Sequence, residues 1–169
     1  MTAAPAPPRL REGSAADAPA VAALLTASRR AAYAGLVPVD ALGSEEEQRL
    51  LWELRLSVDY GTPERTPVLL LAEDPDGTLA GFAYLTPEDD LVRLEQLHVR
   101  PGRTGAGLGG LLLAAALTRF ADHPVRLDVL AANHRAITFY ERHGARRTGT
   151  GTAHFPGGLR LPEYEYGWH

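Results

Sequence analysis

A glycine-rich stretch, RTGAGLGG at residues 103–110, joins a strand-like run, residues 91–99, to an apolar helix-like run, residues 111–120. Glycine inside a helix costs about 1 kcal/mol relative to alanine. Two adjacent glycines at a helix start therefore indicate that another group approaches the backbone closely. The first amides of a helix lack internal partners, and the helix dipole makes that end positive. The stretch predicts a cradle for a pyrophosphate.

Other interpretations of these glycines are open. The glycines are also compatible with a flexible connection, or with close packing of a helix on a sheet without a ligand. Gly105, Gly107 and Gly110 also satisfy the GxGxxG fingerprint of dinucleotide-binding folds. Asp128, on the next strand-like run, lies near the position of the acidic residue that binds the ribose in such folds. An NAD(P)-binding domain is thus an alternative. It is disfavoured because residues 100–104 separate strand from glycines and no repeated strand-helix pattern follows.

Composition predicts a soluble globular domain without a metal. Apolar residues make up 45% of the 169 residues and charged residues 22%, which is ordinary for such a domain. The formal charge of -4 does not indicate the basic surface that nucleic-acid binding requires, and it favours a cationic small substrate. The chain has no cysteine, and its 6 histidines show no metal-binding spacing. We expect neither a thiol nucleophile nor a metal site.

The N-terminal residues, 1–8, are small and proline-rich, with no apolar segment typical of a signal peptide or a membrane span. We expect them to form a disordered leader before a single domain at residues 9–169. A cytoplasmic location without membrane contact follows as a prediction.

Hydrophobic periodicity and turn residues predict a mixed α/β chain. Three strands joined by short turns should form an antiparallel meander, and the long connection through the glycine stretch should set the next strand parallel. Gly144 is expected to end the last helix in a left-handed conformation. The predicted strands are 9–12, 68–73, 78–86, 91–99, 125–130, 145–155 and 159–168, and the predicted helices end near Ala32, run from Ser44 to Leu56, run over 111–120, and begin near Asn133.

Read in this order, and with Asn133 and FYERHG at residues 139–144, the chain resembles the GNAT-type N-acetyltransferases, including bacterial acetyl-CoA-dependent members. The resemblance extends from Arg9 to the Leu-Pro-Glu at residues 161–163. It implies a single α/β domain with a mixed, mostly antiparallel sheet of about six to seven strands and about four flanking helices. It also implies transfer of acetyl from acetyl-CoA to a primary amine of a small molecule or a protein N-terminus, by direct attack in a ternary complex.

The resemblance further implies which residues bind acetyl-CoA. Leu97 and Val99 should pair through their backbones with the pantetheine arm, where two central strands splay, with His98 between them facing the other way. Thr104 replaces the basic or amide side chain of the family pattern, so a side-chain contact depends on Arg103. The full set is Leu97, His98, Val99, Arg103, Thr104, Gly105, Ala106, Gly107, Leu108, Gly109, Gly110, Asn133 and Tyr140.

Two residues are candidates for the chemistry. Tyr140 is expected near the sulfur, where a phenol donates a proton or hydrogen bond to the departing thiolate. Glu95 is the first candidate to accept the proton of the amine. It shares strand parity with Leu97 and Val99, whereas Gln96 and His98 should face the other way unless a bulge intervenes.

Several further side chains are candidates for the acceptor cleft, although packing or surface positions also explain them: Tyr33, Trp52, His154 and Tyr164. Arg29, Arg30, Arg146 and Arg147 are interpreted as solvated. A non-catalytic acyl-CoA-binding or sensing module of the same fold is the alternative function, and both monomer and homodimer are compatible with the sequence.

Overall fold

A computed structural model describes residues 6–169, so most of the predicted leader lies outside the described residues. The predicted elements and their order are confirmed, apart from small shifts of their ends. The strands are β1 (Arg9–Glu12), β2 (Val68–Glu73), β3 (Leu79–Pro87), β4 (Val92–Val99), β5 (Val125–Leu130), β6 (Arg146–His154) and β7 (Arg160–Trp168), and the α-helices are α1 (Ala18–Ala32), α2 (Glu45–Ser57), α3 (Leu108–Arg119) and α4 (His134–Arg142).

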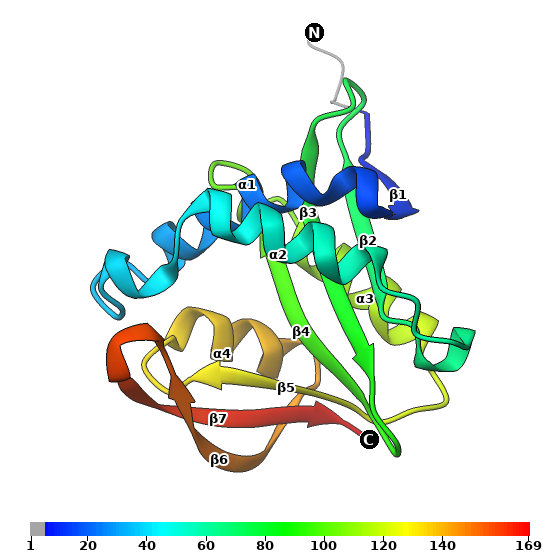
Figure 1. The fold of residues 1–169 in the computed structure, drawn as a ribbon. Coiled ribbons are helices and arrows are strands. Elements are labelled where there is room, and N and C mark those ends of the chain that lie inside the picture. Colours follow the sequence, from blue (N-terminus) through cyan, green and yellow to red (C-terminus); the bar gives the residue numbers. More distant parts are fainter. Residues whose placement is uncertain (1–5) are drawn as a thin grey trace, which may run out of the picture.

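The strands form one 7-stranded sheet in the order β1-β2-β3-β4-β5-β7-β6 (Figure 1). Every neighbouring pair is antiparallel except β4 and β5, which the crossover through α3 sets parallel. The expected meander, crossover and final hairpin are therefore confirmed. A single parallel pair does not make the doubly wound parallel sheet of a dinucleotide-binding domain, so that alternative is wrong.

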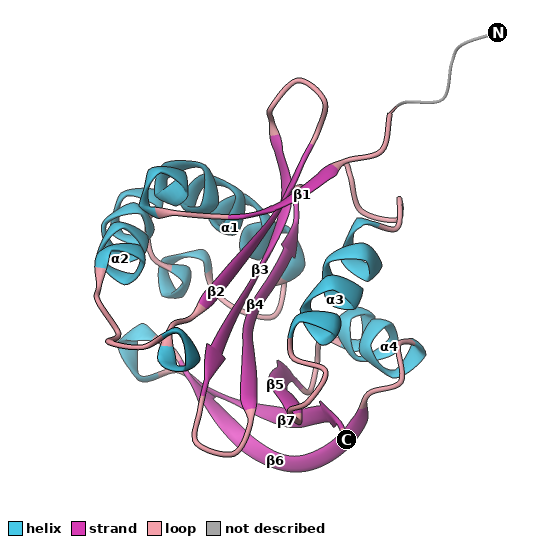
Figure 2. Cartoon of the chain, turned by 90° about the vertical axis from the view of Figure 1, so that its right-hand side faces the viewer, coloured by secondary structure: helices cyan, strands magenta, loops and turns pink. Residues whose placement is uncertain are grey.

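Two helical layers cover the sheet, with α1 and α2 on one face and α3 and α4 on the other (Figure 2). Under α1 and α2, Trp52 packs edge-on against Phe82 and Tyr84 of β3. No helix within residues 6–169 is long and apolar enough to cross a membrane.

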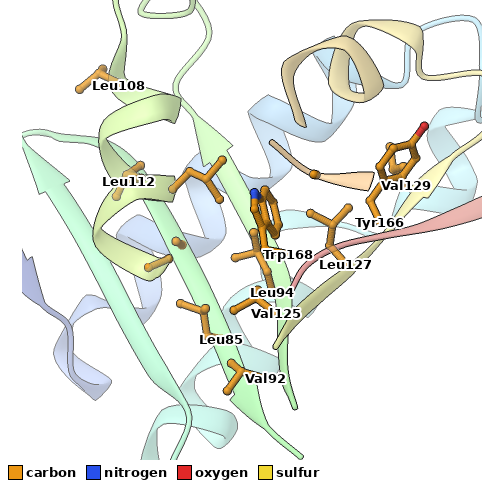
Figure 3. Close-up of a cluster of buried hydrophobic side chains, with 14 of the residues drawn as sticks. Leu85, Val92, Leu94, Leu108, Leu112, Val125, Leu127, Val129, Tyr166 and Trp168 are labelled. Carbon is orange, nitrogen blue, oxygen red and sulfur yellow. The ribbon is translucent and has the colours of Figure 1, made fainter. Parts of the chain in front are cut away.

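The larger apolar core lies under α3 and joins the two halves of the sheet. Leu112 of α3 and Leu85 of β3 are fully buried in it, and Leu127 and Trp168 reach it from β5 and β7 (Figure 3). Burial of a large aliphatic side chain contributes roughly 1.5–3 kcal/mol. This core therefore fixes the start of α3, and with it the glycine stretch, relative to β4.

The two central strands separate soon after they meet. β4 pairs with β5 only at Val92 with Val125 and at Arg93 with Arg126, while β5 continues along β7 to Leu130. Among the described residues, 6–169, no strand thus pairs with residues 94–99 of β4 on their β5 side. The splay that the family resemblance implies is present.

A bulge interrupts β4 at Glu95. Tyr84 of β3 pairs with Gln96 and its neighbour Leu85 with Leu94, which leaves Glu95 without a partner of its own. Leu94 and Leu97 both pack on the α3 side although they are three residues apart. The strand parity assumed for Glu95 is therefore wrong, because the extra residue breaks the alternation.

A third apolar cluster closes one end of the molecule. Val37 and Leu42, in the connection between α1 and α2, pack with Leu130 of β5 and with Phe155 and Leu159 at the tip of the β6–β7 hairpin. Connection, strand and hairpin tip thus form one wall beside the splayed strands.

Candidate functional site

Two cavities occupy the splay between β4 and β5. The first has a volume of about 660 Å³ and extends from the glycine stretch between β4 and α4 to α1. The second, about 320 Å³, lies between α1, β4, β5 and the β6–β7 hairpin. Tyr33, Glu95, Gln96 and Asp128 line both. The two cavities therefore meet, so a ligand in one can contact a ligand in the other.

The glycine stretch has the backbone of an anion cradle. Gly105 and Gly107 have φ angles of +83° and +82°, which favour glycine, and no atom lies within 4 Å of where their Cβ would stand. Helical hydrogen bonding begins with Leu111 N donating to Gly107 O at 3.0 Å. Within residues 6–169, the amides of residues 107–110 therefore have no partner. These donors and the helix dipole fit a pyrophosphate.

Gly109 and Gly110 have a different role, since α3 begins at Leu108, before them. A Cβ on Gly109 would lie 3.3 Å from the Phe139 ring, and one on Gly110 would lie 3.0 Å from His143 Nε2. The two glycines thus let α3 approach α4. Close packing, which one of the alternative interpretations assigned to the glycines, is therefore present at this pair, but against a helix instead of the sheet, and it leaves their amides open to the first cavity.

The basic side chains beside the stretch are engaged. Arg103 and Arg100 both donate to Asp74 Oδ2 in the β2–β3 turn, Arg100 at 3.0 Å. The hydrogen bond from Arg103, and to a smaller extent that from Arg100, lowers the pKa of the Asp74 carboxyl, and the two positive charges add to this effect. Arg103 still lines the first cavity, as does Thr104. Ala106 is the one residue of the predicted cofactor set that does not.

Residues predicted to hold the pantetheine arm lie along the first cavity. Leu97 and Val99 belong to the β4 segment without a partner on its β5 side. Its backbone groups are therefore free to pair with an amide-bearing arm. Asn133 lines the same cavity and caps α4, its Oδ1 accepting from Ala136 N at 3.2 Å.

Tyr140 lines the first cavity from α4. Its ring packs edge-on against Phe139 and Trp168, with centroid distances of 5.3 and 6.3 Å. Its hydroxyl makes no hydrogen bond to any residue in the described part of the chain. Burial raises the pKa of Tyr140, and the nearby Tyr33 adds to the rise. Tyr140 is therefore a neutral phenol at neutral pH, with a proton to donate.

Glu95 lies where the two cavities meet, with its side chain exposed. The bulge lies two residues beyond Arg93, the last residue of β4 that pairs with β5. A carboxylate there can reach a group that enters through the second cavity, which is the position required of a proton acceptor.

His98 points toward α1, opposite to Leu97, as expected from its parity with Gln96. Its Nε2 lies 2.7 Å from Gln96 Oε1 and its Nδ1 lies 2.9 Å from Ser28 Oγ. Because a carbonyl oxygen only accepts, Nε2 carries the hydrogen and Nδ1 accepts from the Ser28 hydroxyl. Burial lowers the pKa of His98 to about 3, and the charge of Arg29 acts in the same direction.

Polar side chains of both signs line the second cavity. Arg29 is half-buried there, so its interpretation as a solvated residue is wrong, whereas its neighbour Arg30 is exposed as expected. Burial raises the pKa of Glu163, and the carboxylate of Asp128 raises it further. Asp128 itself has a raised pKa, chiefly through burial, although Arg93 lies 3.4 Å away.

Of the four residues predicted as candidates for the acceptor cleft, two line the second cavity and two do not. Tyr33 and His154 line the second cavity. Trp52 is fully buried in the core, and Tyr164 lies outside both cavities with the Arg147 guanidinium 4.3 Å from its ring centre. Arg146 and Arg147 are exposed, as expected.

Sequence reasoning missed some lining residues. Ser28, Ala31 and Ala32 of α1 line the first cavity. Their helical spacing and small side chains are the sequence pattern that could have indicated a helix face beside a ligand. Gln96 and Glu163 carried no such signal. Within residues 6–169, no group of three or more His, Asp or Glu side chains is arranged to hold a metal ion.

Comparison with known proteins gives one consistent result. The sequence profile of the acetyltransferase (GNAT) family matches residues 27–145. A mycothiol acetyltransferase of Kineococcus radiotolerans is 44% identical over 85 residues, which cover 49% of this chain but only 28% of that protein. The chain thus spans less than a third of that relative.

Solved structures share the fold. A GCN5-related N-acetyltransferase from Rhodopseudomonas palustris superimposes with a TM-score of 0.76 at 21% identity, covering 99% of this chain and 98% of that one. The PaiA N-acetyltransferase from Thermoplasma acidophilum, in complex with coenzyme A, gives a TM-score of 0.70 at 20% identity, covering 95% and 97% of the two chains.

Proposed function

The chain belongs to the acetyltransferase (GNAT) family, and we propose that it transfers the acetyl group of acetyl-CoA to a primary amine by direct attack in a ternary complex. The observation that carries this proposal is the meeting of the two cavities at Glu95 and Tyr33. One cavity ends at unpartnered helix amides, and the other ends among charged side chains. Donor and acceptor can therefore bind together, and no covalent enzyme intermediate is needed.

In this proposal the first cavity binds the donor. The amides of residues 107–110 hold the pyrophosphate, and the free edge of β4 from Leu94 to Val99 pairs with the pantetheine arm. A complex of coenzyme A with the PaiA N-acetyltransferase, which shares the fold, supports this assignment. Arg103 contributes positive charge near the cradle while it holds Asp74.

Tyr140 assists departure of the thiolate. As the new carbon–nitrogen bond forms and the carbon–sulfur bond breaks, negative charge develops on sulfur. A thiolate is a weaker base than a phenolate, so Tyr140 stabilises the sulfur mainly by donating a hydrogen bond. Its raised pKa keeps the phenol protonated for this purpose.

Glu95 accepts the proton that the amine loses. An ammonium ion has no lone pair to attack with, so the amine must be deprotonated before or during bond formation. The exposed Glu95 carboxylate at the bulge is open to the second cavity, through which we propose that the amine enters. It acts directly or through a water molecule.

Thiol release from acetyl-CoA in the presence of a broad amine panel tests the proposal. We expect coenzyme A to appear in step with acetylated amine, identified by mass. A protein that binds acetyl-CoA but acetylates no amine would favour the non-catalytic acyl-CoA module instead. A folded protein that binds no acetyl-CoA would contradict the donor assignment itself.

A further inference from the structure

We propose that the acceptor is a primary amine that also carries a carboxylate, and that Arg29 and Gln96 bind this carboxylate in the second cavity. The inference rests on the proposed acetyl transfer and narrows its acceptor to amines of the amino-acid class. It follows from two sets of groups that line this cavity: hydrogen-bond donors of Arg29 and Gln96, and carboxylates that form no ion pair with a described residue.

Arg29 is the arginine that lines the second cavity. It is half-buried in the last turns of α1 and lines the second cavity, yet no Asp or Glu oxygen within residues 6–169 lies within 4.0 Å of it. Its guanidinium lies 5.9 Å from the centre of the Tyr33 ring. Burial raises the pKa of Tyr33, and Arg29 opposes this larger effect by its charge and by a hydrogen bond, which lower the pKa. A guanidinium has five N–H donors, and its planar fork matches a carboxylate in two parallel hydrogen bonds, so Arg29 keeps donors for a ligand. The residue is thus prepared for an anionic group from outside the chain.

Gln96 supplies a second donor, held in a fixed orientation. Its Oε1 accepts from His98 Nε2 at 2.7 Å, and His98 is held in turn by Ser28 Oγ at 2.9 Å. The amide nitrogen of Gln96 has no hydrogen-bond partner in the described chain, and the residue lines both cavities. His98 and Ser28 are therefore positioning residues, which present the Gln96 N–H groups to a ligand oxygen.

The opposite charges in this cavity stay apart. Glu163 and Glu95 line it as well, and neither forms an ion pair with Arg29 or with any other described residue. Charges that share a cavity of about 320 Å³ and do not pair leave two poles. A ligand with an ammonium and a carboxylate complements both poles, whereas a ligand with cations alone leaves Arg29 unpaired.

This orientation suits the reaction. With its carboxylate on Arg29 and Gln96, the acceptor has its amine within reach of Glu95, next to Gln96 in sequence and open to the first cavity. The nitrogen then forms its bond to the acetyl carbon, sulfur leaves with the electron pair of the broken bond, and the amine proton passes toward Glu95.

Matched acceptor pairs test the inference: phenylalanine with phenethylamine and phenylalaninamide, and lysine with cadaverine. In the parent protein we expect the amino acids to have the higher kcat/KM. In Arg29→Gln, KM for the amino acids should rise at least about tenfold, because a charge-assisted hydrogen bond is lost. KM for acetyl-CoA and for phenethylamine should not change. Gln96→Glu, which replaces the donor by a carboxylate of the same shape, should act in the same direction.

Arg30→Gln is the matched control, since Arg30 is the exposed neighbour that lines neither cavity. It should behave as the parent. Two results would overturn the inference and leave the proposed acetyl transfer intact. One is a kcat/KM for cadaverine or phenethylamine equal to that for the matched amino acid, and the other is an unchanged KM for the amino acids in Arg29→Gln. A parent that binds no acetyl-CoA in calorimetry would overturn both.

Discussion

At the scale of single residues, Tyr140 is the group on which the chemistry depends most. Its phenol lines the first cavity, is protonated at neutral pH and has no hydrogen-bond partner in the described chain. We predict that Tyr140→Phe lowers kcat by roughly 100-fold or more, the size typical of a lost transition-state donor. The Kd for acetyl-CoA should change little, because the ring and its packing remain. Steady-state kinetics and calorimetry measure the two quantities.

Tyr166→Phe is the control for the loss of a hydroxyl. Tyr166 is buried, lines neither cavity and donates to Glu141 Oε1 at 2.7 Å. Its replacement should lower stability and leave kcat unchanged. Equal kcat in the parent and in Tyr140→Phe would remove the proposed role of Tyr140 in thiolate departure.

The residues also show how far the sequence predicts a site. The glycine stretch was predictable because a positive φ and close approach both require glycine, and Gly107 and Gly110 illustrate the two reasons. The position of Glu95 was not, because a bulge changes which way a side chain faces without a signal in composition. Arg29 has the sequence pattern of a solvated residue, and only the tertiary structure shows its burial.

At the scale of elements, close contact between β3, β4 and α3 fixes the geometry of the first cavity. Gly81 of β3 is the tightest point: a Cβ there would lie 2.9 Å from the His98 carbonyl oxygen and 2.9 Å from Leu112 Cδ1. We predict that Gly81→Ala lowers the free energy of unfolding by about 1–3 kcal/mol, the usual cost of overpacking. Urea unfolding followed by circular dichroism measures the change.

Gly151→Ala provides the comparison, because a Cβ at Gly151 of β6 would lie 3.5 Å from Glu163 Oε1, an ordinary contact. Its effect should be near zero, or stabilising, since alanine loses less conformational entropy in a strand than glycine does. If both variants were equally stable relative to the parent, the close contact of β3 with α3 would be contradicted.

The helices and strands could be predicted from the sequence more completely than the order of the strands in the sheet. Turn residues and hydrophobic periodicity indicated each strand and helix, and the short connections indicated the β2–β3–β4 meander. The insertion of β7 between β5 and β6 was not predictable, because a hairpin can join a sheet by either arm. The choice depends on burial of Tyr166 and Trp168 under α3 and α4, which is a tertiary effect.

At the scale of the whole molecule, His98 couples stability to pH. Its pKa falls from an ordinary 6.5 to about 3 on folding, because burial and Arg29 disfavour the imidazolium. Between these values the unfolded chain binds a proton that the folded chain does not. The stabilising contribution is therefore complete above about pH 6.5 and is lost as the pH falls toward 3. Asp128 and Glu163, whose pKa values are raised, act in the opposite sense at lower pH.

We predict that the free energy of unfolding falls between pH 7 and 5.5 in the parent, and that the fall is smaller in His98→Gln, which keeps polar groups but does not titrate. Denaturant unfolding at a series of pH values gives the difference, in which the other groups cancel. His123→Gln, at an exposed histidine, should keep the parental slope. The same slope in His98→Gln and the parent would contradict a His98 that stays neutral in the folded protein.

The cradle at the start of α3 is the claim on which the proposed function depends, and calorimetric titration with acetyl-CoA of the parent, Gly107→Asp and Gly107→Asn tests it directly. Both side chains have open space at this position, and both tolerate a left-handed backbone better than most residues. Only aspartate adds a negative charge where the pyrophosphate should bind. We predict that Gly107→Asp weakens binding by at least about tenfold more than Gly107→Asn does. Undiminished binding by Gly107→Asp, or no binding by the folded parent, would contradict the account.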